Sequence, residues 1–162
     1  MTPGKCAAIL RAMRAVIQRV RSASVSVRGE SVAEIGCGLL ILLGVEESDG
    51  ADDIEWLAGK VTGLRLFADG DGAWNLSVAE LPGEVLVVSQ FTLFASTRKG
   101  TKPSWHRAAK PETAAPMCDA FVRRLEMLLP GRVRAGRFGA MMDVALVNDG
   151  PVTLLLDTRQ RE

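Results

Sequence analysis

The sequence predicts a single α/β domain that is rich in strands and has two helices available to cover a sheet. Its 162 residues are the size of one ordinary domain. Hydrophobic residues make up 48% and charged residues 24%, a balance typical of soluble globular proteins. Several short β-branched runs and only two stretches of helical periodicity follow one another, and no repeat, linker or low-complexity tract divides them.

The first half of the chain has the pattern of three strands followed by a helix. Residues 13–20 and 23–27 alternate and are β-branched, and Arg28-Gly29-Glu30 is a turn signal before a strand over 31–35. The apolar run 38–45 suits a strand that is buried on both faces. The helix is predicted by apolar residues at helical spacing, which are Ile54, Leu57, Ala58, Val61 and Leu64. Before them stand acids suited to a helix cap and first turn, which are Asp49, Asp52 and Asp53.

The second half contributes more strands and a second helix. The polar, basic segment 95–110 is expected to be a surface loop. A helix should begin near Thr113, because Pro116 fits only a first turn, and should end at Pro130. Taken alone, residues 148–151 (Asn-Asp-Gly-Pro) are ordinary hairpin-turn chemistry. The remaining strands are predicted over residues 84–90, 133–138, 142–147 and 152–156.

Cysteine and histidine usage argues against a disulfide framework and against a zinc site. Cys6, Cys37 and Cys118 are scattered and odd in number, which suits a reducing compartment. His106 is the single histidine, so a tetrahedral zinc site is not expected. A carboxylate-only magnesium site stays open, although no fixed spacing favours it; we expect no metal and no cofactor. No apolar run approaches the ~20 residues that span a bilayer, so we expect a cytoplasmic protein.

Charge is segregated along the chain although the net charge is only +1. Residues 1–28 hold six Lys or Arg and no acid, and residues 89–140 hold ten against three acids. Residues 29–88 hold two Lys or Arg against twelve acids, and the run 46–55 among them is expected to be a solvated helix start. Folding either gathers the basic segments into one face that can meet phosphates, or mixes the segments so that the charges cancel.

Polar groups follow the strand that ends near residue 90. Ser89, Gln90 and Thr92 offer hydroxyl and amide groups that are neutral near pH 7. Strand ends are places where a rigid scaffold presents polar groups to a ligand, but such residues can also merely satisfy backbone groups. A Ser-His-Asp or Cys-His system would have to use His106, which lies in the basic loop and is more typical of a surface contact.

Three motifs together resemble the D-aminoacyl-tRNA deacylase family. MRAVIQRV begins at Met13, SQFTLFA at Ser89 and LVNDGPVT at Leu146, in that family's order and spacing. GLLILLGVE, NLSV, KPSW and GRFGAMMDVALVNDG are similar as well, although Trp105 stands where an aromatic such as Phe is more familiar. The expected organisation is therefore an N-terminal extension or mis-called start over residues 1–12, a deacylase domain over 13–157 and a frayed tail over 158–162.

The resemblance implies a homodimer with a β-barrel-like sheet flanked by helices. It implies an active site at the subunit interface that holds the 3′-terminal adenosine of tRNA with its esterified amino acid. In the family a cis Gly-Pro peptide of one subunit enters the site of the other, and here the pair is Gly150-Pro151. Such a backbone gate rejects an L side chain by clash, but should admit glycine and hence glycyl-tRNA mischarged on tRNA-Ala. Arg19 is the candidate brace of this gate.

The implied reaction is hydrolysis of the activated ester, with Ser89, Gln90 and Thr92 as candidate catalytic residues. The Thr92 hydroxyl is either a nucleophile or a hydrogen-bond anchor. The anchor is favoured because no base is in evidence to activate it, whereas backbone N–H groups can stabilise the oxyanion. The 2′-hydroxyl of the tRNA can then help to position or activate water. By resemblance, the amino acid and adenosine are bound by Phe91, Met142, Asn148, Gly150, Pro151 and Thr153.

The basic loop is the candidate contact for the acceptor-end phosphates, through Arg98, Lys99, Lys102 and Arg107. Such contacts position an RNA without reading its sequence. The alternative is a solvated loop. Two other functions stay open: a non-catalytic tRNA- or RNA-binding module, and a small hydrolase of D-amino-acid esters or N-acyl amino acids.

Overall fold

The computed structural model describes residues 12–162, so most of the predicted N-terminal extension lies outside the described residues. Its main sheet has six strands. Five of them follow one another in the order β2-β1-β3-β6-β7, and the sixth, β8, pairs with β1. β1 is antiparallel to β2, β3 and β8, whereas β3, β6 and β7 are parallel. The six strands are β1 (Arg14–Val27), β2 (Glu30–Ile35), β3 (Gly38–Gly44), β6 (Glu84–Ser89), β7 (Val133–Ala135) and β8 (Asp143–Asp157).

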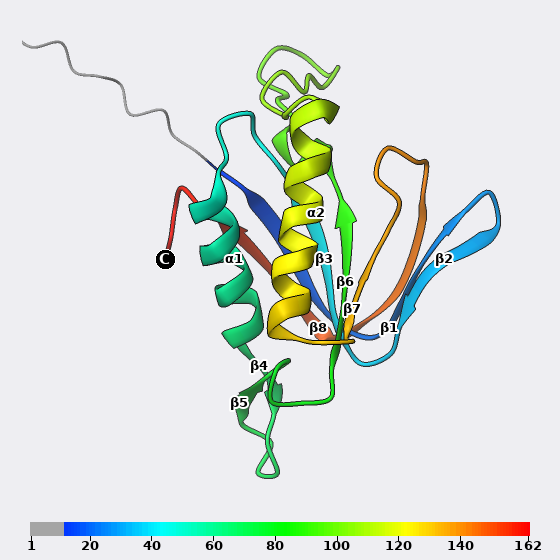
Figure 1. The fold of residues 1–162 in the computed structure, drawn as a ribbon, viewed down its shortest axis with the longest axis vertical. Coiled ribbons are helices and arrows are strands. Elements are labelled where there is room, and N and C mark those ends of the chain that lie inside the picture. Colours follow the sequence, from blue (N-terminus) through cyan, green and yellow to red (C-terminus); the bar gives the residue numbers. More distant parts are fainter. Residues whose placement is uncertain (1–11) are drawn as a thin grey trace, which may run out of the picture.

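Two helices lie side by side on one face of this sheet (Figure 1). They are α1 (Ala51–Gly63) and α2 (Pro111–Leu128). A separate hairpin of β4 (Arg65–Ala68) and β5 (Trp74–Ser77) follows α1 and lies at the opposite end of the molecule from the loop over residues 95–110 (Figure 1). The sheet curls into a nearly closed, barrel-like shape, so the predicted strand-rich α/β fold with two flanking helices is confirmed.

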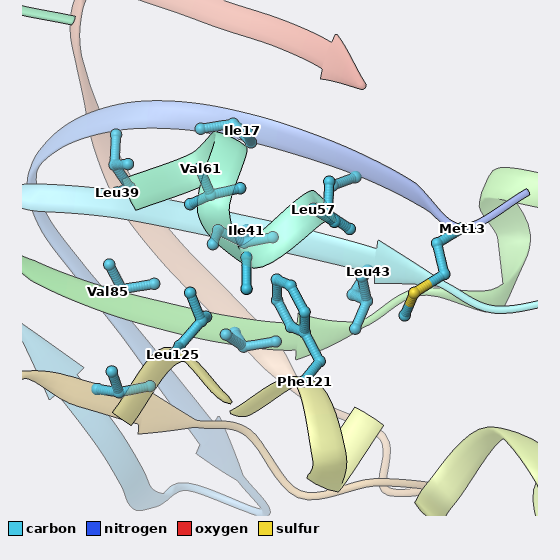
Figure 2. Close-up of a cluster of buried hydrophobic side chains, with 14 of the residues drawn as sticks. Met13, Ile17, Leu39, Ile41, Leu43, Leu57, Val61, Val85, Phe121 and Leu125 are labelled. Atoms are coloured by element: carbon cyan, nitrogen blue, oxygen red, sulfur yellow. The ribbon is translucent and has the colours of Figure 1, made fainter. Parts of the chain in front are cut away.

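The main hydrophobic core lies between the helices and the sheet. Leu57 of α1 and Phe121 of α2 are fully buried and point toward Ile41 of β3 (Figure 2). β3 is buried along nearly its whole length, as its continuous apolar run predicts, because the curled sheet covers its second face. That second face has a smaller core of Val20, Ala23, Val25, Ala33, Ile35, Leu40, Leu86 and Val88.

The last strand differs from its prediction. Residues 142–147 and 152–156 were expected to be two strands joined by a hairpin turn, but both belong to β8. β8 pairs antiparallel with β1 before and after the Asn-Asp-Gly-Pro segment, with Ser22 opposite Val147 and Gln18 opposite Thr153. The chain therefore keeps its direction, and the predicted hairpin is wrong. Turn-forming residues also form bulges, and here the long partner strand β1 decides between the two.

The second helix begins earlier than predicted. Pro111, rather than a residue near Thr113, opens α2, so Pro116 lies inside the helix and beyond its first turn. Proline normally disfavours this position, but packing of the buried Cys118, Phe121 and Leu125 holds the helix together through it. The strand predicted over 133–138 is also shorter, since β7 ends at Ala135.

The end of the chain makes defined contacts. Thr158, in the segment expected to be a frayed tail, is buried and its hydroxyl accepts a hydrogen bond from the Met13 amide at 2.8 Å. Arg159 donates to the Glu46 carboxylate at 2.9 Å. Among residues 12–162 no helix is both long and apolar enough to cross a membrane.

Candidate active site

The Ser89–Thr92 segment lies where β6 ends and a short 3₁₀ helix, η1 (Phe91–Phe94), begins. The backbone N–H of Gln90 donates to the Leu43 carbonyl at 2.7 Å, and this bond holds the turn at the end of β3. Phe94 is fully buried and anchors the other end of η1. The polar side chains between these two anchors are therefore held on a rigid part of the scaffold.

A cavity of about 550 Å³ opens beside this segment. β6 and η1 contribute Ser89, Gln90 and Phe91, and the connection between β7 and β8 contributes Phe138 and Met142. The basic loop and α2 contribute a mostly apolar part of the wall: Trp105, Ala108, Ala109, Pro111, Ala114 and Cys118. Leu43 and Val45, at the end of β3, add further apolar surface. The cavity therefore has polar groups along one side and apolar surface elsewhere, as in sites that bind small organic ligands.

Two exposed aromatic rings stand at this cavity. Phe91 is 54% exposed and Trp105 is 43% exposed, and their ring centroids lie 5.5 Å apart in an edge-to-face arrangement. Exposed aromatic faces of this kind can stack on a flat ligand or a base. The sequence assigns Phe91 to the site and places Trp105 only in a surface loop, because nothing local shows that the loop folds back over η1.

Thr92 is held by a neighbour rather than by a base. Gln90 Nε2 donates to Thr92 Oγ1 at 2.5 Å. Thr92 is not among the residues that line the cavity, whereas Ser89 and Gln90 are. His106 is exposed, and its Nδ1 lies 3.2 Å from the Ser104 hydroxyl. The arrangement favours Thr92 as a hydrogen-bonding group and offers it no imidazole partner.

Gly150 and Pro151 form a second feature, a ridge on β8. Four residues, Asp149 to Val152, stand opposite the single residue Arg19 of β1, because Val20 pairs with Asn148 and Gln18 pairs with Thr153. The extra residues form a bulge, which we call the Gly-Pro ridge (residues 149–152); Gly150 and Pro151 are exposed, whereas Val152 is buried in the main core. The Gly150-Pro151 peptide is cis, as the resemblance implies.

Glycine is required at the ridge. Gly150 has φ +131°, a region that L side chains rarely adopt. An added Cβ would also lie 2.9 Å from Val152 Cγ2 and 3.1 Å from Arg19 Nη2. The main chain at Gly150 is thus packed closely against both Val152 and Arg19.

A hydrogen-bond network holds the ridge from beneath. Asn148 Nδ2 donates to the carbonyls of Arg19 at 2.9 Å and of Val152 at 3.0 Å, so one side chain spans the bulge. The Thr153 hydroxyl donates to Asn148 Oδ1 at 3.4 Å. Asn148 and Thr153 are predicted substrate-binding residues; here Asn148 Nδ2 joins Val152 of the ridge to Arg19 of β1, and the Thr153 hydroxyl contacts Asn148 and accepts from Gln18 Nε2 at 3.2 Å.

Arg19 contacts the ridge in the way expected of a brace. Its Nε donates to the Asp149 carbonyl at 3.1 Å and lies 3.5 Å from the Asp149 carboxylate. Its Nη1 donates to the Leu66 carbonyl of β4 at 2.5 Å. The exposed Arg21 also lies 3.3 Å from the Asp149 carboxylate, so two cations flank this residue.

The four basic residues of the loop differ in their surroundings. Arg98, Lys99 and Lys102 are exposed. Arg107 instead donates to Glu46 at 3.0 and 2.6 Å and lies 5.6 Å from the centroid of the Phe94 ring. The Arg107 guanidinium therefore holds the loop against the rest of the domain through Glu46.

Glu46 is the residue that sequence reasoning missed here. The acidic run 46–55 was expected to be a solvated helix start, yet Glu46 and Asp53 are buried, so this expectation is wrong for both. Glu46 accepts from Arg107 and also from Arg159, residues far from it in sequence. In the same run, burial raises the pKa of Asp49 to about 7. Among the described residues, no three His, Cys, Asp or Glu side chains are grouped so as to hold a metal ion.

Within one chain the cavity and the Gly-Pro ridge are separate. No residue of 149–152 lines the cavity. Arg19 links the ridge to β4 and β5, and this hairpin lies at the far end of the molecule from the loop that walls the cavity (Figure 1). The structure therefore brings Ser89, Gln90, Phe91 and Met142 together in one place and the ridge with its brace in another.

Comparison with known proteins identifies the family. The chain matches the family described as D-Tyr-tRNA(Tyr) deacylase over residues 16–157. It is 56% identical to the D-aminoacyl-tRNA deacylase of Akkermansia muciniphila and 57% identical to that of Opitutus terrae, each over 93% of this chain and 100% of the relative.

Solved structures agree with this match. A structure titled "c-Myc DNA Unwinding Element Binding Protein" is 41% identical, with a TM-score of 0.84 over 88% of this chain and 97% of that one. A second, titled as a probable eukaryotic D-amino acid tRNA deacylase, is 18% identical with a TM-score of 0.78 over 90% and 99% of the two chains, and shows the shared fold. The chain belongs to the D-Tyr-tRNA(Tyr) deacylase family.

Proposed function

We propose that this protein hydrolyses the ester bond of D-aminoacyl-tRNA, releases the D-amino acid and the tRNA, and spares L-aminoacyl-tRNA. Close relatives over the full domain are named D-aminoacyl-tRNA deacylase, which supports the reaction class. The observation that carries the finer proposal is the pairing of a polar-edged cavity with a convex ridge of main chain braced by Arg19. Charged tRNA as the substrate places the protein in the cytoplasm.

The cavity suits the terminal aminoacyl-adenosine. Its volume of about 550 Å³ lies within the range of small-molecule sites. A flat base can contact the apolar and aromatic wall around Phe138 and Trp105, while the ester lies toward Ser89 and Gln90, where the polar groups are. The amino acid then extends out of the cavity, where a group from outside the chain can meet it.

We propose that a second copy supplies that group as its Gly-Pro ridge. The ridge and the cavity of one chain lie apart, so a homodimer is the simplest way to combine them. β8 offers a surface for association, because Val147 is 52% exposed and Leu155 is 66% exposed on a strand whose one partner in the sheet is β1. Exposed apolar side chains near a projecting edge are typical of subunit contacts.

Main-chain atoms are well suited to select chirality. A side chain can change rotamer to admit a larger group, whereas the ridge is held by Asn148 and Arg19 and has no rotamer to change. Placed against the α-carbon, the ridge leaves room for hydrogen on one side and excludes an L side chain by clash. Glycine has no side chain to exclude, so glycyl-tRNA mischarged on tRNA-Ala is a second substrate.

In the proposed reaction, water attacks the ester carbonyl carbon. The carbonyl oxygen becomes an oxyanion that backbone N–H groups near Phe91 can stabilise. The bond to the 3′-oxygen of the adenosine then breaks, and this oxygen leaves with a proton derived from the water. Thr92 acts as a hydrogen-bond anchor through Gln90, which lines the cavity and donates to the Thr92 hydroxyl, and the neighbouring 2′-hydroxyl of the tRNA positions or activates the water.

The exposed cations Arg98, Lys99 and Lys102 of the loop contact the acceptor-end phosphates. They lie on the segment whose Trp105 walls the cavity, so a tRNA end that enters the cavity passes along this loop. Contacts of this kind add affinity without base specificity. Arg107 contributes by ordering the loop through Glu46.

The test is hydrolysis of D-Tyr-tRNA and L-Tyr-tRNA by the wild type and by Thr92→Ala. The wild type is expected to cleave only the D ester. Thr92→Ala should retain deacylation within about tenfold, whereas loss of a nucleophile costs on the order of 10⁴-fold or more. Complete loss of activity with tRNA binding intact would instead make Thr92 the nucleophile. Equal cleavage of a free D-tyrosine ester would favour a small-ester hydrolase.

The second candidate is a nucleic-acid-binding module without catalysis. It is favoured by the exposed cations of the loop and by the similar solved structure titled "c-Myc DNA Unwinding Element Binding Protein". Tight binding of tRNA with no release of D-tyrosine over the uncatalysed rate would establish this alternative and overturn the proposed deacylase.

A further inference from the structure

We infer that Trp74 is a positioning residue for stereochemical selection, which acts through Arg19 on the Gly-Pro ridge. The inference rests on the proposed role of the ridge as the gate. Its basis is a continuous series of contacts, from the indole of Trp74 to the guanidinium of Arg19 and from there to the Asp149 carbonyl, one residue before Gly150.

Arg19 is enclosed in a way that fixes its guanidinium. Its side chain is only 11% exposed. Two backbone carbonyls accept from it within the plane of the guanidinium, Asp149 from β8 and Leu66 from β4. The Trp74 ring covers the group, with the guanidinium carbon 4.9 Å from the ring centroid. The two carbonyls and the Asp149 carboxylate restrain the guanidinium at its N–H groups and the indole restrains its face, so its position depends on the indole as well as on the polar contacts.

Burial in the core does not account for Trp74. Its side chain is 52% exposed, and it belongs to neither of the two hydrophobic clusters. Its indole stands on an outlying hairpin and is directed to a cation that supports the ridge. A large exposed aromatic in this position has little effect on folding but covers Arg19 from solvent.

The hairpin that carries Trp74 is stabilised by its own contacts. The Asp69 carboxylate accepts from the Asp71 and Ala73 amides at 2.8 and 3.1 Å and from Asn75 Nδ2 at 2.7 Å. None of these bonds uses the indole. Loss of the ring should therefore leave the hairpin folded and free the guanidinium of Arg19, which moves the Asp149 carbonyl and the ridge with it.

The expected signature is a change in selectivity and not in rate. The D ester already fits the site, so a slightly displaced ridge leaves its kcat/KM within about twofold. The L ester is excluded by clash alone, and a small displacement of the ridge relieves that clash. Trp74→Ala should therefore lower the ratio of kcat/KM for D-Tyr-tRNA to that for L-Tyr-tRNA by about tenfold or more, through a gain on the L ester.

The experiment compares five variants with the wild type by single-turnover hydrolysis of both esters: Trp74→Ala, Trp74→Phe, Trp56→Ala, Arg19→Ala and the double variant of Arg19→Ala with Trp74→Ala. Trp74→Phe keeps a ring over Arg19 and should restore most of the ratio. Trp56→Ala is the control for loss of an indole elsewhere: Trp56 is on α1 and lies against Lys60 and Arg161 rather than Arg19, and although it also packs against the main core, the ratio should stay at the wild-type value. Adding Trp74→Ala to Arg19→Ala should produce no further change, because the two residues act in series.

Each outcome decides the matter. If the wild type discriminates between the esters and Trp74→Ala has the same ratio, the inference about Trp74 is wrong while the proposed gate stands. A ratio that is lower in the double variant than in Arg19→Ala also overturns the inference. An equal fall of both rates in Trp74→Ala, with a lowered midpoint of thermal unfolding, assigns Trp74 a structural role and overturns it as well. A wild type that cleaves both esters alike overturns the proposed gate, and the inference falls with it.

Discussion

The cavity and the Gly-Pro ridge are built in opposite ways. The cavity is concave, lined mainly by apolar side chains from four separate parts of the chain, and has its polar groups along one side. The ridge is a bulge of main chain, held by β1, by the β4–β5 hairpin through Arg19, and by the buried side chain of Val152 in the main core. The cavity depends on side chains that can move, whereas the ridge depends on backbone held by hydrogen bonds.

Because of this difference, we expect the cavity to set the affinity for the charged tRNA and the ridge to set which stereoisomer is accepted. Apolar walls bind many ligands of suitable size, and discriminate weakly between ligands that differ by a small group. A rigid backbone contributes little attraction but rejects whatever collides with it. Changes to the cavity should therefore alter how much tRNA is bound or how fast it is cleaved, and changes to the ridge should alter which stereoisomer is accepted.

The largest effect is expected from Gly150→Ala. Its φ and the short contacts of an added Cβ force the ridge out of place, at a cost of roughly 1–3 kcal/mol in unfolding free energy. We expect loss of D-Tyr-tRNA deacylation or of its stereospecificity, measured beside thermal unfolding. Gly131→Ala is the control, because it also has a positive φ but no atom within 4 Å of the added Cβ. Wild-type activity and selectivity in Gly150→Ala would show that the ridge is not part of the site.

Trp105→Ala should have the next largest effect, and on binding instead of selection. Stacking of a base on an exposed ring contributes about 1–3 kcal/mol, so KM for the charged tRNA should rise about 5- to 100-fold with the D-to-L ratio unchanged. Trp105→Phe keeps a ring and should recover most of the affinity. A change in stereospecificity without a change in KM would contradict this division of roles.

Neutralising Lys99 and Lys102 together should have a smaller effect, visible mainly in salt dependence. Each lost phosphate contact should reduce the slope of log affinity against log salt by about 0.7 for single-stranded RNA. Lys60, which stands on α1 beside Trp56, provides the control Lys60→Ala. An unchanged slope in the double variant would mean that the loop is merely solvated.

The smallest effect on activity, but a clear one on stability, is expected from Asp49→Asn. Burial raises the pKa of Asp49 from 3.8 to about 7. A carboxyl group with a raised pKa stabilises the fold fully below about pH 3.8, and this contribution is lost as the pH rises through about 7. The midpoint of thermal unfolding of Asp49→Asn minus that of the wild type should therefore be larger at about pH 8 than at about pH 5.

Asp69→Asn is the matched control for that experiment. Hydrogen bonds, first from Asn75 and then from the Asp71 amide, lower the pKa of Asp69. Its stabilisation is present above pH 3.8 and is lost only as the pH falls through its lowered pKa, so the difference from wild type should stay flat from about pH 5 to 8. A flat difference for Asp49→Asn too would contradict the raised pKa.

Most of the fold could be predicted because its signals are local. The continuous apolar run of β3 and the helical spacing of Leu57 and Val61 each lie within one element. The Ser89–Thr92 segment was also placed correctly at a strand end, since the strand before it is strongly apolar. Periodicity and turn residues report such features directly, because they depend on neighbours a few positions away.

Features that depend on distant partners could not be predicted in this way. The Asn-Asp-Gly-Pro segment suits a hairpin turn or a bulge equally well, and only the pairing of β8 along the full length of β1 selects the bulge. Glu46 looks like any acid before a helix, and only Arg107 and Arg159 explain its burial. In both cases the deciding contact spans more than sixty residues of sequence or joins two long strands.

By itself, the sequence determined the strand-rich α/β class with two helices, the strand-end position of the polar segment and, through three motifs, the resemblance to the family. The tertiary structure alone decided that Asn148 and Thr153 support the ridge, that Arg107 holds the loop, and that Trp74 covers Arg19. The physical reason is that backbone conformation is set largely by local sterics and hydrophobic periodicity, whereas a side chain's partner is set by whichever distant group the folded chain brings within hydrogen-bonding distance.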